Sequence, residues 1–318
     1  MRFKTEDGFV HAVDGVSFAL DAGEVLAVVG ESGCGKTVTA LSLVGLLPPS
    51  AEVGGHVRLD GEDLVQVPVA RLRELRGKQV GFVFQEPMTS LNPVLTVGRQ
   101  VGEVLRRHQG LSRQAALRRA AELLDLVGVP EAERRLGEYP HQLSGGLRQR
   151  VMIAIAVACE PRVLIADEPT TALDVTIQAG ILDLLRDLRH RLGTAIVLIT
   201  HDLGVVADVA DRVLVMYAGR KVEEAGADDL FASPQHPYTV GLLGAVPNPA
   251  RHAAGSHLQE IPGMVPSLSQ PIPACAFAPR CPRADDRSRS ERPPLEEVRA
   301  GHLVACFHPG PEPPDGSR

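Results

Sequence analysis

The sequence predicts an α/β fold, and three segments of the chain support this prediction. The apolar run 24–29 leads directly into the glycine-rich segment 30–37, after which apolar residues recur at the spacing of a helix. A second apolar run, 162–166, ends next to two carboxylates, and a third, 195–200, follows a helical pattern at 177–192. Each run is short enough to be a buried strand, and strands that alternate with helices are typical of an α/β core.

Residues 1 to about 29 alternate apolar and polar side chains, as in 10–13 and 16–20. Alternation of this kind predicts the strands of a half-exposed sheet. The helix that begins at Lys36 should end before Pro48, because proline does not continue a helix. The predicted buried face of this helix consists of Val38, Leu41, Val44 and Leu47.

A further strand, a helical insert and a hairpin complete the predicted core. Residues 79–84 are apolar enough to form a buried strand. Apolar residues then recur at helical spacing through much of 95–160, which predicts a mostly helical insert between two halves of the α/β core. The segments 212–216 and 221–223, joined by Gly219, predict a hairpin.

The composition changes near residue 232, because sixteen of the 25 prolines lie from Pro234 onward. We therefore divide the chain into a first domain, 1–231, and a loop-rich C-terminal region, 232–308, in which we expect little regular structure. The final segment, 309–318, is expected to be a disordered tail.

Composition excludes several classes of protein. The net charge of −6 and the 3% of aromatic residues argue against binding to nucleic acid. The apolar run 151–159 is far shorter than the roughly 20 residues that a bilayer span needs. No basic segment followed by an apolar one opens the chain, and five unevenly spaced cysteines do not predict a disulfide scaffold. We expect a cytoplasmic protein that reaches a membrane only through a partner.

Residues 30–37 match the phosphate-binding motif G-x-x-x-x-G-K-[ST] in full, between a predicted strand and a predicted helix. Glycines allow backbone N–H groups to turn inward onto anionic oxygens, and the helix that follows adds positive potential. Lys36 would hold the β- and γ-phosphates of a nucleotide, and Thr37 would ligate Mg²⁺. Cys34 stands at a variable position and is interpreted as a small filler. All eight residues are candidate nucleotide contacts: Gly30, Glu31, Ser32, Gly33, Cys34, Gly35, Lys36 and Thr37.

The segment 143–150 contains the run L-S-G-G, and Asp167 follows Ser144 by 167 − 144 = 23 residues. With a phosphate-binding loop upstream and Asp167 and Glu168 downstream, the chain resembles the ATPase subunits of ATP-binding-cassette (ABC) transporters. The resemblance implies a phosphate-loop ATPase core with an antiparallel β subdomain and a helical insert. It also implies an enzyme that hydrolyses ATP by phosphoryl transfer to water.

The resemblance assigns roles to residues at the ends of the apolar runs. A carboxylate buried there needs a cation or a hydrogen-bond partner. Asp167 would bind Mg²⁺ through water, and Glu168 would be the general base that polarises the attacking water. Gln85 would contact both Mg²⁺ and that water. His201, which follows Glu168 by 201 − 168 = 33 residues, would contact the γ-phosphate and position Glu168.

Ser144, Gly145 and Gly146 open a helix whose amino end offers N–H groups and a hydroxyl to an anion. In the family this end covers the γ-phosphate of the ATP on the opposite subunit, which requires a head-to-tail pair with two ATP molecules between the subunits. Asp174 belongs to the loop by which each subunit senses the site of the other. Leu147 departs from the commonest residue at its position but leaves the phosphate-contacting residues intact.

The adenine is usually stacked on an aromatic side chain near the amino terminus in this family. Phe3 and Phe9 are the two candidates in this chain. Gly8 stands close to where the aromatic is expected, so the sequence does not choose between them.

The resemblance narrows to the ATPases of dipeptide and oligopeptide importers. The segments 86–93 and 139–142 look like the versions found in that group, and so do 236–239 and 261–266 in the C-terminal region. The resemblance implies a peripheral subunit on the cytoplasmic face of the cell membrane that powers the import of peptides or related small solutes. Its implied partners are a second ATPase subunit, more often a related chain than a copy, two transmembrane permease subunits and an extracytoplasmic solute-binding protein.

Two other functions remain open from the sequence. One is a soluble ABC ATPase that acts on ribosomes or DNA, although such proteins usually carry two cassettes or a long coiled-coil insert, and this chain has neither. The other is a regulatory or iron–sulfur subunit that binds ATP without turnover, which the intact Glu168 and His201 argue against.

Three cysteines, Cys275, Cys281 and Cys306, lie where some members of the group hold an iron–sulfur cluster with four cysteines. Ser288 occupies the place of the expected third cysteine. A four-iron cluster normally needs four thiolates, so three thiolates with Ser288 or His308 would be a poorer ligand set. The sequence leaves two interpretations, a bound [4Fe-4S] cluster or a reduced packing cluster of thiols.

Overall fold

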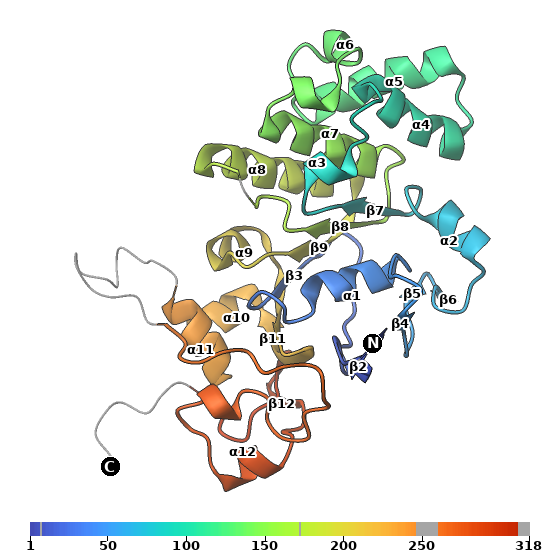
Figure 1. Cartoon of the computed structure of the whole chain (residues 1–318). Coiled ribbons are helices and arrows are strands. Elements are labelled where there is room, and N and C mark those ends of the chain that lie inside the picture. The colour runs from blue at the N-terminus through green and yellow to red at the C-terminus, as the bar shows by residue number, and fades with distance from the viewer. Residues whose placement is uncertain (7, 172, 246–259, 311–318) are drawn as a thin grey trace.

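The computed structural model describes residues 1–6, 8–171, 173–245 and 260–310. Within these ranges one large sheet has the strand order β12-β13-β11-β10-β3-β9-β8-β7 (Figure 1). β11 (Arg220–Gly226) pairs antiparallel with β10 and completes the predicted hairpin. The parallel part of the sheet comprises β7 (Val80–Val83), β8 (Val163–Asp167), β9 (Ala195–Ile199), β3 (Val25–Val29) and β10 (Arg212–Tyr217). The predicted α/β fold and its core strands are therefore confirmed.

Helices cover both faces of this sheet. Alternate residues of β3 belong to the core on one side or the other, which explains why the whole strand is apolar. One core includes α1 (Lys36–Leu43), and the opposite face is covered by α8 (Val175–Leu192) and α9 (Leu203–Val209). α1 is confirmed as a helix but ends before Gly45, whose φ of +61° breaks the helical backbone short of Pro48.

The segment 95–160 is mostly helical, as predicted, and forms the end of the molecule at the top of Figure 1. Thr96, Ser112 and Ser144 cap α4, α5 and α7, each accepting a hydrogen bond from a backbone N–H in the first turn. No helix of the described ranges is long and apolar enough to cross a membrane. The helices of this segment are α4 (Val97–Gln109), α5 (Arg113–Leu126), α6 (Ala132–Arg135), the 3-10 turn Pro140–Gln142 and α7 (Gly145–Val157), and the short helix α3 (Pro87–Ser90) precedes them.

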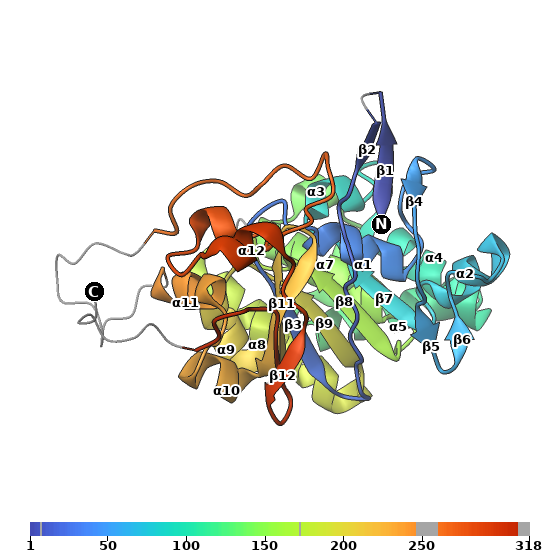
Figure 2. The same ribbon diagram turned by 90° about the horizontal axis from the view of Figure 1, so that it is seen from below.

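The N-terminal part forms an antiparallel sheet, as the resemblance implies, but most of its strands lie outside 10–13 and 16–20. β1 (Arg2–Thr5) pairs antiparallel with β2 (Gly8–Val10) and with β4 (Ala51–Glu52), in a small sheet at the edge of the molecule (Figure 2). The strands expected at 10–13 and 16–20 are wrong apart from the end of β2, because these residues run to β3 without a strand partner. Between α1 and β7 the chain forms β5 (Arg58–Leu59), β6 (Glu62–Asp63) and α2 (Val69–Leu75).

The alternation at 16–20 has a different origin from the one we inferred. Val16, Phe18 and Leu20 pack against the core on the α1 side, while the residues between them are exposed. An extended segment that lies on a core buries every second side chain, as a strand does. Side-chain periodicity indicates which residues are buried. Only the tertiary structure shows whether the backbone is hydrogen-bonded to a neighbouring strand.

The C-terminal region has more regular structure than we predicted. β13 (His302–Val304) pairs with β11, and β12 (Glu296–Arg299) pairs with β13, so this region extends the central sheet. These strands are too short for periodicity to reveal them. The helices of this part are α10 (Ala227–Ala232), α11 (Pro237–Gly244), the 3-10 turn Ala278–Arg280 and α12 (Asp286–Ser290). Of the tail expected to be disordered, 311–318 lies outside the described residues.

Candidate functional site

The loop 30–37 connects β3 to α1 and is pressed against neighbouring backbone. Gly30 has a φ of +152°, and a Cβ atom placed on it would lie 2.2 Å from the carbonyl oxygen of Met216. Gly35, which precedes α1, has a φ of +101°, and its Cβ would lie 2.6 Å from the carbonyl oxygen of Ala12. Only glycine fits at these two positions. The curved conformation of the loop therefore depends on its two glycines and on the backbone of Ala12 and Met216, which lies against it.

The side chain of Lys36 is folded into the loop. Its Nζ donates to the carbonyl oxygens of Gly30, at 2.7 Å, and of Glu31, at 3.1 Å, and the residue is 5% exposed. A phosphate bound in the concave side of the loop 30–37 would contact both this ammonium group and the N-terminus of α1. Cys34 is fully buried under the loop, and burial raises the pKa of its thiol, which suits a packing role.

Thr37 and Asp167 supply oxygen atoms next to the loop. Thr37 Oγ1 donates to Asp167 Oδ1 at 3.2 Å, and Asp167, at the end of β8, is 2% exposed. Burial raises the pKa of the Asp167 carboxyl to about 6, because it lacks solvent to stabilise its charge. A hydroxyl and a carboxylate held together are the hard ligands that Mg²⁺ prefers, so these residues fit the implied ion.

Glu168 is the centre of a cluster of polar side chains. Gln85 Nε2 donates to its Oε2 at 3.1 Å, and Thr171 Oγ1 donates to the same oxygen at 2.8 Å. His201 Nδ1 lies 3.5 Å from Glu168 Oε1. Gln85, Glu168 and His201 follow β7, β8 and β9, which are neighbours in the parallel sheet, so their carboxyl ends bring these residues together.

Two features of this cluster were not expected from the sequence. Thr171 fixes one oxygen of Glu168, and its spacing of three residues was the only signal for that contact. Glu168 also has a φ of +46°, which is rare for a residue other than glycine. Its backbone N–H is nevertheless held by the carbonyl oxygen of Ile199 at 2.9 Å, so the fold maintains this conformation.

The L-S-G-G residues lie at the start of α7. Ser144 caps the helix by accepting from the N–H of Leu147 at 3.4 Å, and both Ser144 and Gly145 are exposed. A Cβ on Gly146 would lie 2.7 Å from the side chain of Ile177 on α8, so glycine allows the two helices to approach. Within the described ranges no hydrogen bond joins this helix end to the loop 30–37, so the structure of one chain does not bring the two together.

Asp174 lies beside the L-S-G-G residues. It caps α8, and its Oδ1 accepts from the N–H of Ile177 at 3.0 Å. A Cβ on Gly145 would meet the side chain of Leu173 at 3.8 Å, so this loop and the start of α7 are in contact. Asp174 is exposed, so its carboxylate faces out of this chain.

The two adenine candidates lie on neighbouring strands of the small sheet. Phe3 is on β1 and Phe9 is on β2, and both are half-buried. The guanidinium of Arg2 lies 4.4 Å from the centre of the Phe9 ring, so that ring already has a cation over one face.

The sequence did not predict that the C-terminal region reaches the phosphate-binding loop. The hydroxyl oxygen of Tyr238, on α11, accepts from the backbone N–H of Glu31 at 2.8 Å. Arg280 forms an ion pair with the side chain of the same glutamate. The segment 236–239 was noted in the sequence only for its resemblance, and no local pattern marked Arg280.

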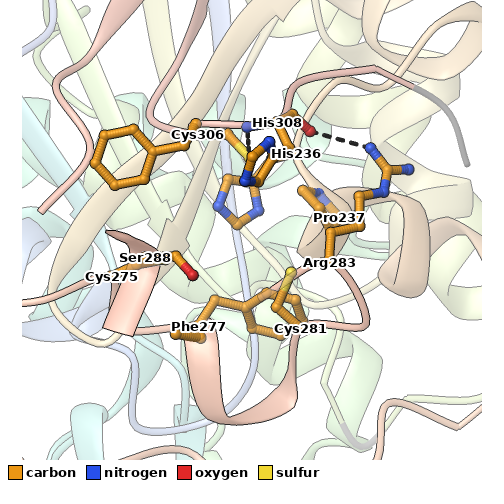
Figure 3. A pocket seen from close by; sticks show the side chains of 11 residues that line it. His236, Pro237, Cys275, Phe277, Cys281, Arg283, Ser288, Cys306 and His308 are labelled. Atoms are coloured by element: carbon orange, nitrogen blue, oxygen red, sulfur yellow. Dashed lines mark hydrogen bonds between the residues drawn. The ribbon is translucent and has the colours of Figure 1, made fainter. Parts of the chain in front are cut away.

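Three cysteines converge on one pocket of the C-terminal region (Figure 3). Cys275, Cys281 and Cys306 line it, as do Ser288 and His308. Burial raises the pKa of all three thiols, that of Cys306 to about 11. No group of three or more His, Cys, Asp or Glu residues in the described ranges is placed to hold a metal ion.

The serine in this pocket is occupied by local hydrogen bonds. Ser288 Oγ donates to the carbonyl oxygen of Asp285 at 2.8 Å and accepts from its N–H at 2.9 Å. His308 Nε2 lies 2.9 Å from the carboxylate of Asp285. With Ser288 engaged, the pocket offers three thiols, which is fewer than the four thiolates that a four-iron cluster normally takes.

Comparison with known proteins agrees with this geometry. Residues 13–171 match the family model described as "ABC transporter", and residues 222–287 match that described as "Oligopeptide/dipeptide transporter, C-terminal region". The chain is 53% identical over 308 residues, 96% of its length and 92% of the relative, to a probable peptide ABC transporter ATP-binding protein of Sinorhizobium fredii. It is 50% identical over 309 residues, 97% of its length and 91% of the relative, to an oligopeptide transport ATP-binding protein of Salmonella typhimurium.

A solved structure has the same fold over most of the chain. It is a dimeric ATP-binding cassette in a post-hydrolysis state, bound to ADP and Pi. The two chains share 30% identity with a TM-score of 0.64, over 71% of this chain and 95% of the other.

Proposed function

Because this chain belongs to the family of ABC transporter ATP-binding subunits, we propose that it hydrolyses ATP to power the import of peptides or related small solutes. The observation that carries the proposal is the position of Glu168, which lies beside Asp167 and is held by Gln85 and Thr171. The match of residues 222–287 to the C-terminal region of peptide transporters supports the peptide class.

Different residues around the loop 30–37 have different roles in ATP hydrolysis. Lys36 and the N–H groups of the loop bind the phosphates of ATP. Mg²⁺ would be held by Thr37, Gln85 and Asp167. When bound, Mg²⁺ neutralises charge on the phosphate oxygens. Glu168 takes a proton from the attacking water, and His201 and Gln85 keep its carboxylate directed at that water.

The exposed helix start at Ser144 supports a two-subunit site. Ser144 and Gly145 are exposed at the start of α7, as required if this helix end covers the ATP of a partner. We infer that the chain forms a head-to-tail pair with a second ATPase subunit. In this family that subunit is more often a related chain than a second copy of the same chain. Asp174, whose neighbour Leu173 lies against Gly145, links the two sites.

Exposed apolar residues support attachment to membrane subunits. Phe84, Met88 and Val94 are 38%, 58% and 76% exposed and lie within residues 84–94, on either side of Gln85 along the chain. Exposed apolar side chains gathered on one segment indicate an interaction surface. We infer that two permease subunits dock here, that a solute-binding protein completes the complex, and that the chain works at the cytoplasmic face of the membrane. We further propose two domains, 1–231 and 232–308.

The first test is a pull-down of the tagged chain from detergent-solubilised membranes, with mass spectrometry of the proteins recovered. We expect two multi-span proteins, a second ATPase and a solute-binding protein. Met88→Glu is the matched variant, because it places a charge on the exposed segment and should lose the multi-span proteins while still binding ATP. Recovery of ribosomal or DNA-repair proteins without membrane partners would favour a soluble ABC ATPase and overturn the transport role.

We also propose that the three cysteines pack as reduced thiols and hold no iron–sulfur cluster. The engaged hydroxyl of Ser288 supports this, because it leaves the pocket with three thiols. Protein purified without oxygen should contain well under one iron per chain and show no absorbance near 400 nm. Stoichiometric iron that is lost in Cys281→Ser would show that the chain holds a cluster after all.

A further inference from the structure

The phosphate-binding loop contains an acidic residue beside its lysine. Glu31 follows Gly30 directly, and its carbonyl oxygen accepts from Lys36 Nζ at 3.1 Å. Its side chain carries a carboxylate, which is 28% exposed, in a loop that should attract anions. A negative charge at this place opposes the binding of a polyphosphate, so its neutralisation matters for the site.

Arg280 neutralises this carboxylate. Its Nη1 and Nη2 atoms donate to Oε2 and Oε1 of Glu31, at 2.6 and 3.0 Å, in a two-pronged ion pair. The two residues are 249 positions apart in the sequence. The side chain of Arg280 is only 4% exposed, so this pair is more strongly coupled than an ion pair in water.

The C-terminal region holds Arg280 in place. Its Nε donates to the carbonyl oxygen of Pro262 at 2.9 Å, and its Nη2 donates to that of Ile261 at 3.0 Å. Its Nη1 also lies 3.4 Å from the hydroxyl of Tyr217 on β10. Carbonyl oxygens and a hydroxyl carry no full charge, so in this arrangement Glu31 supplies the carboxylate that balances the guanidinium.

The backbone of Glu31 is fixed by the same region. Tyr238, fully buried, accepts the N–H of Glu31 and packs against Tyr217 with 4.6 Å between ring centres. Phe277 lies edge-on to Tyr217 at 5.2 Å, three residues before Arg280. The aromatic cluster thus ties the turn that bears Arg280 to the loop, and it leaves little room for the loop to shift.

We propose that Arg280 is a positioning residue that sets the affinity of the phosphate-binding loop for ATP by neutralising Glu31. This inference rests on the proposed role of the loop in binding ATP. With Arg280 in place, Lys36 and the N–H groups of the loop present an uncompensated positive field to the phosphates. Without Arg280, the freed carboxylate of Glu31 repels them and offers Lys36 a competing partner.

The test is a double-mutant cycle with Arg280→Gln, Glu31→Gln and the double variant, in the full-length chain. Binding of N-methylanthraniloyl-ATP is followed by fluorescence, and circular dichroism shows that each variant is folded. We expect Arg280→Gln to weaken binding of the ATP analogue on the order of tenfold at low salt. In the double variant, the added Glu31→Gln should restore binding to within about threefold of the unaltered chain. High salt should reduce the loss of affinity in Arg280→Gln, because salt screens the repulsion between the Glu31 carboxylate and the phosphates.

Two further variants separate charge from packing. Arg280→Lys keeps the positive charge without the two-pronged geometry, so it should bind within about threefold of the unaltered chain. If Arg280→Gln does not fold, Arg280→Met takes its place in the cycle, because it also removes the charge while it keeps an unbranched side chain of similar length. Arg289→Gln removes an exposed arginine from α12 of the same region and should leave binding unchanged.

The outcomes distinguish this inference from the proposed function. Failure of the unaltered chain to bind the ATP analogue would overturn the ATP site itself. Normal binding by the folded Arg280→Gln variant, or a loss that Glu31→Gln does not reverse, would overturn the charge role of Arg280 and leave the ATP site standing. An equal loss in Arg280→Lys would show that geometry, and not charge, is what Arg280 provides.

Discussion

Replacement of Glu168 by glutamine is expected to abolish steady-state ATP hydrolysis, with a fall in rate of roughly 10²–10⁴-fold. The amide cannot take a proton from water, but it keeps the size of the side chain and the contacts of Gln85 and Thr171 on its oxygen. ATP binding should therefore survive, and the variant should accumulate as an ATP-bound pair of subunits. Phosphate release measures the first effect, and size-exclusion chromatography with ATP measures the second.

Glu160→Gln is the matched control for this experiment. Glu160 has a φ of +52°, close to the +46° of Glu168, but it lies on the surface in an ion pair with Arg119. The same chemical change there should leave hydrolysis within about twofold, because exposed ion pairs contribute little. Unchanged hydrolysis in Glu168→Gln would show that another group is the general base.

Replacement of Gly30 by alanine is expected to destabilise the protein by about 3–5 kcal/mol and to abolish ATP binding. The added methyl would lie 2.2 Å from the carbonyl oxygen of Met216 and 2.8 Å from Cys34 Sγ, and the first of these atoms is backbone. β10 cannot retreat without losing its ladder with β3. The loop must therefore move, which displaces Lys36. Urea unfolding measures the free energy, and fluorescence of an ATP analogue measures binding.

Gly193→Ala separates steric conflict from backbone strain. Gly193 has a φ of +63° at the end of α8, and a Cβ there would meet nothing within 4 Å. Its replacement should cost only about 1 kcal/mol, with ATP binding unchanged. If Gly30→Ala costs no more than Gly193→Ala, the close approach of β10 to the loop does not constrain the site.

Much of the site was predictable because its elements are local in the sequence. A strand, a glycine loop and a helix occupy consecutive residues from 24 to 43, and the buried strand before Asp167 shows in its apolar residues alone. The roles of Gln85 and His201 came from resemblance. The structure adds that both contact Glu168, because β7, β8 and β9 are neighbours in one parallel sheet.

Errors in the prediction arose where one pattern has two physical causes. Alternation at 16–20 reflects an extended chain lying on the core, without a ladder. β12 and β13 were missed because three or four residues carry no readable period, and partners far away in the chain stabilise them. The regular structure after residue 232 was therefore underestimated.

The amino-acid sequence alone determined the phosphate-binding loop, the order of the core strands and helices along the chain, and the polar residues that follow the strands β7, β8 and β9. These features depend on side-chain type and on spacing over a few residues, which the linear chain contains. Only the tertiary structure decided that Arg280 and Tyr238 hold Glu31. Contacts across 249 and 207 positions depend on how the C-terminal region packs against the core, and no local pattern encodes that packing.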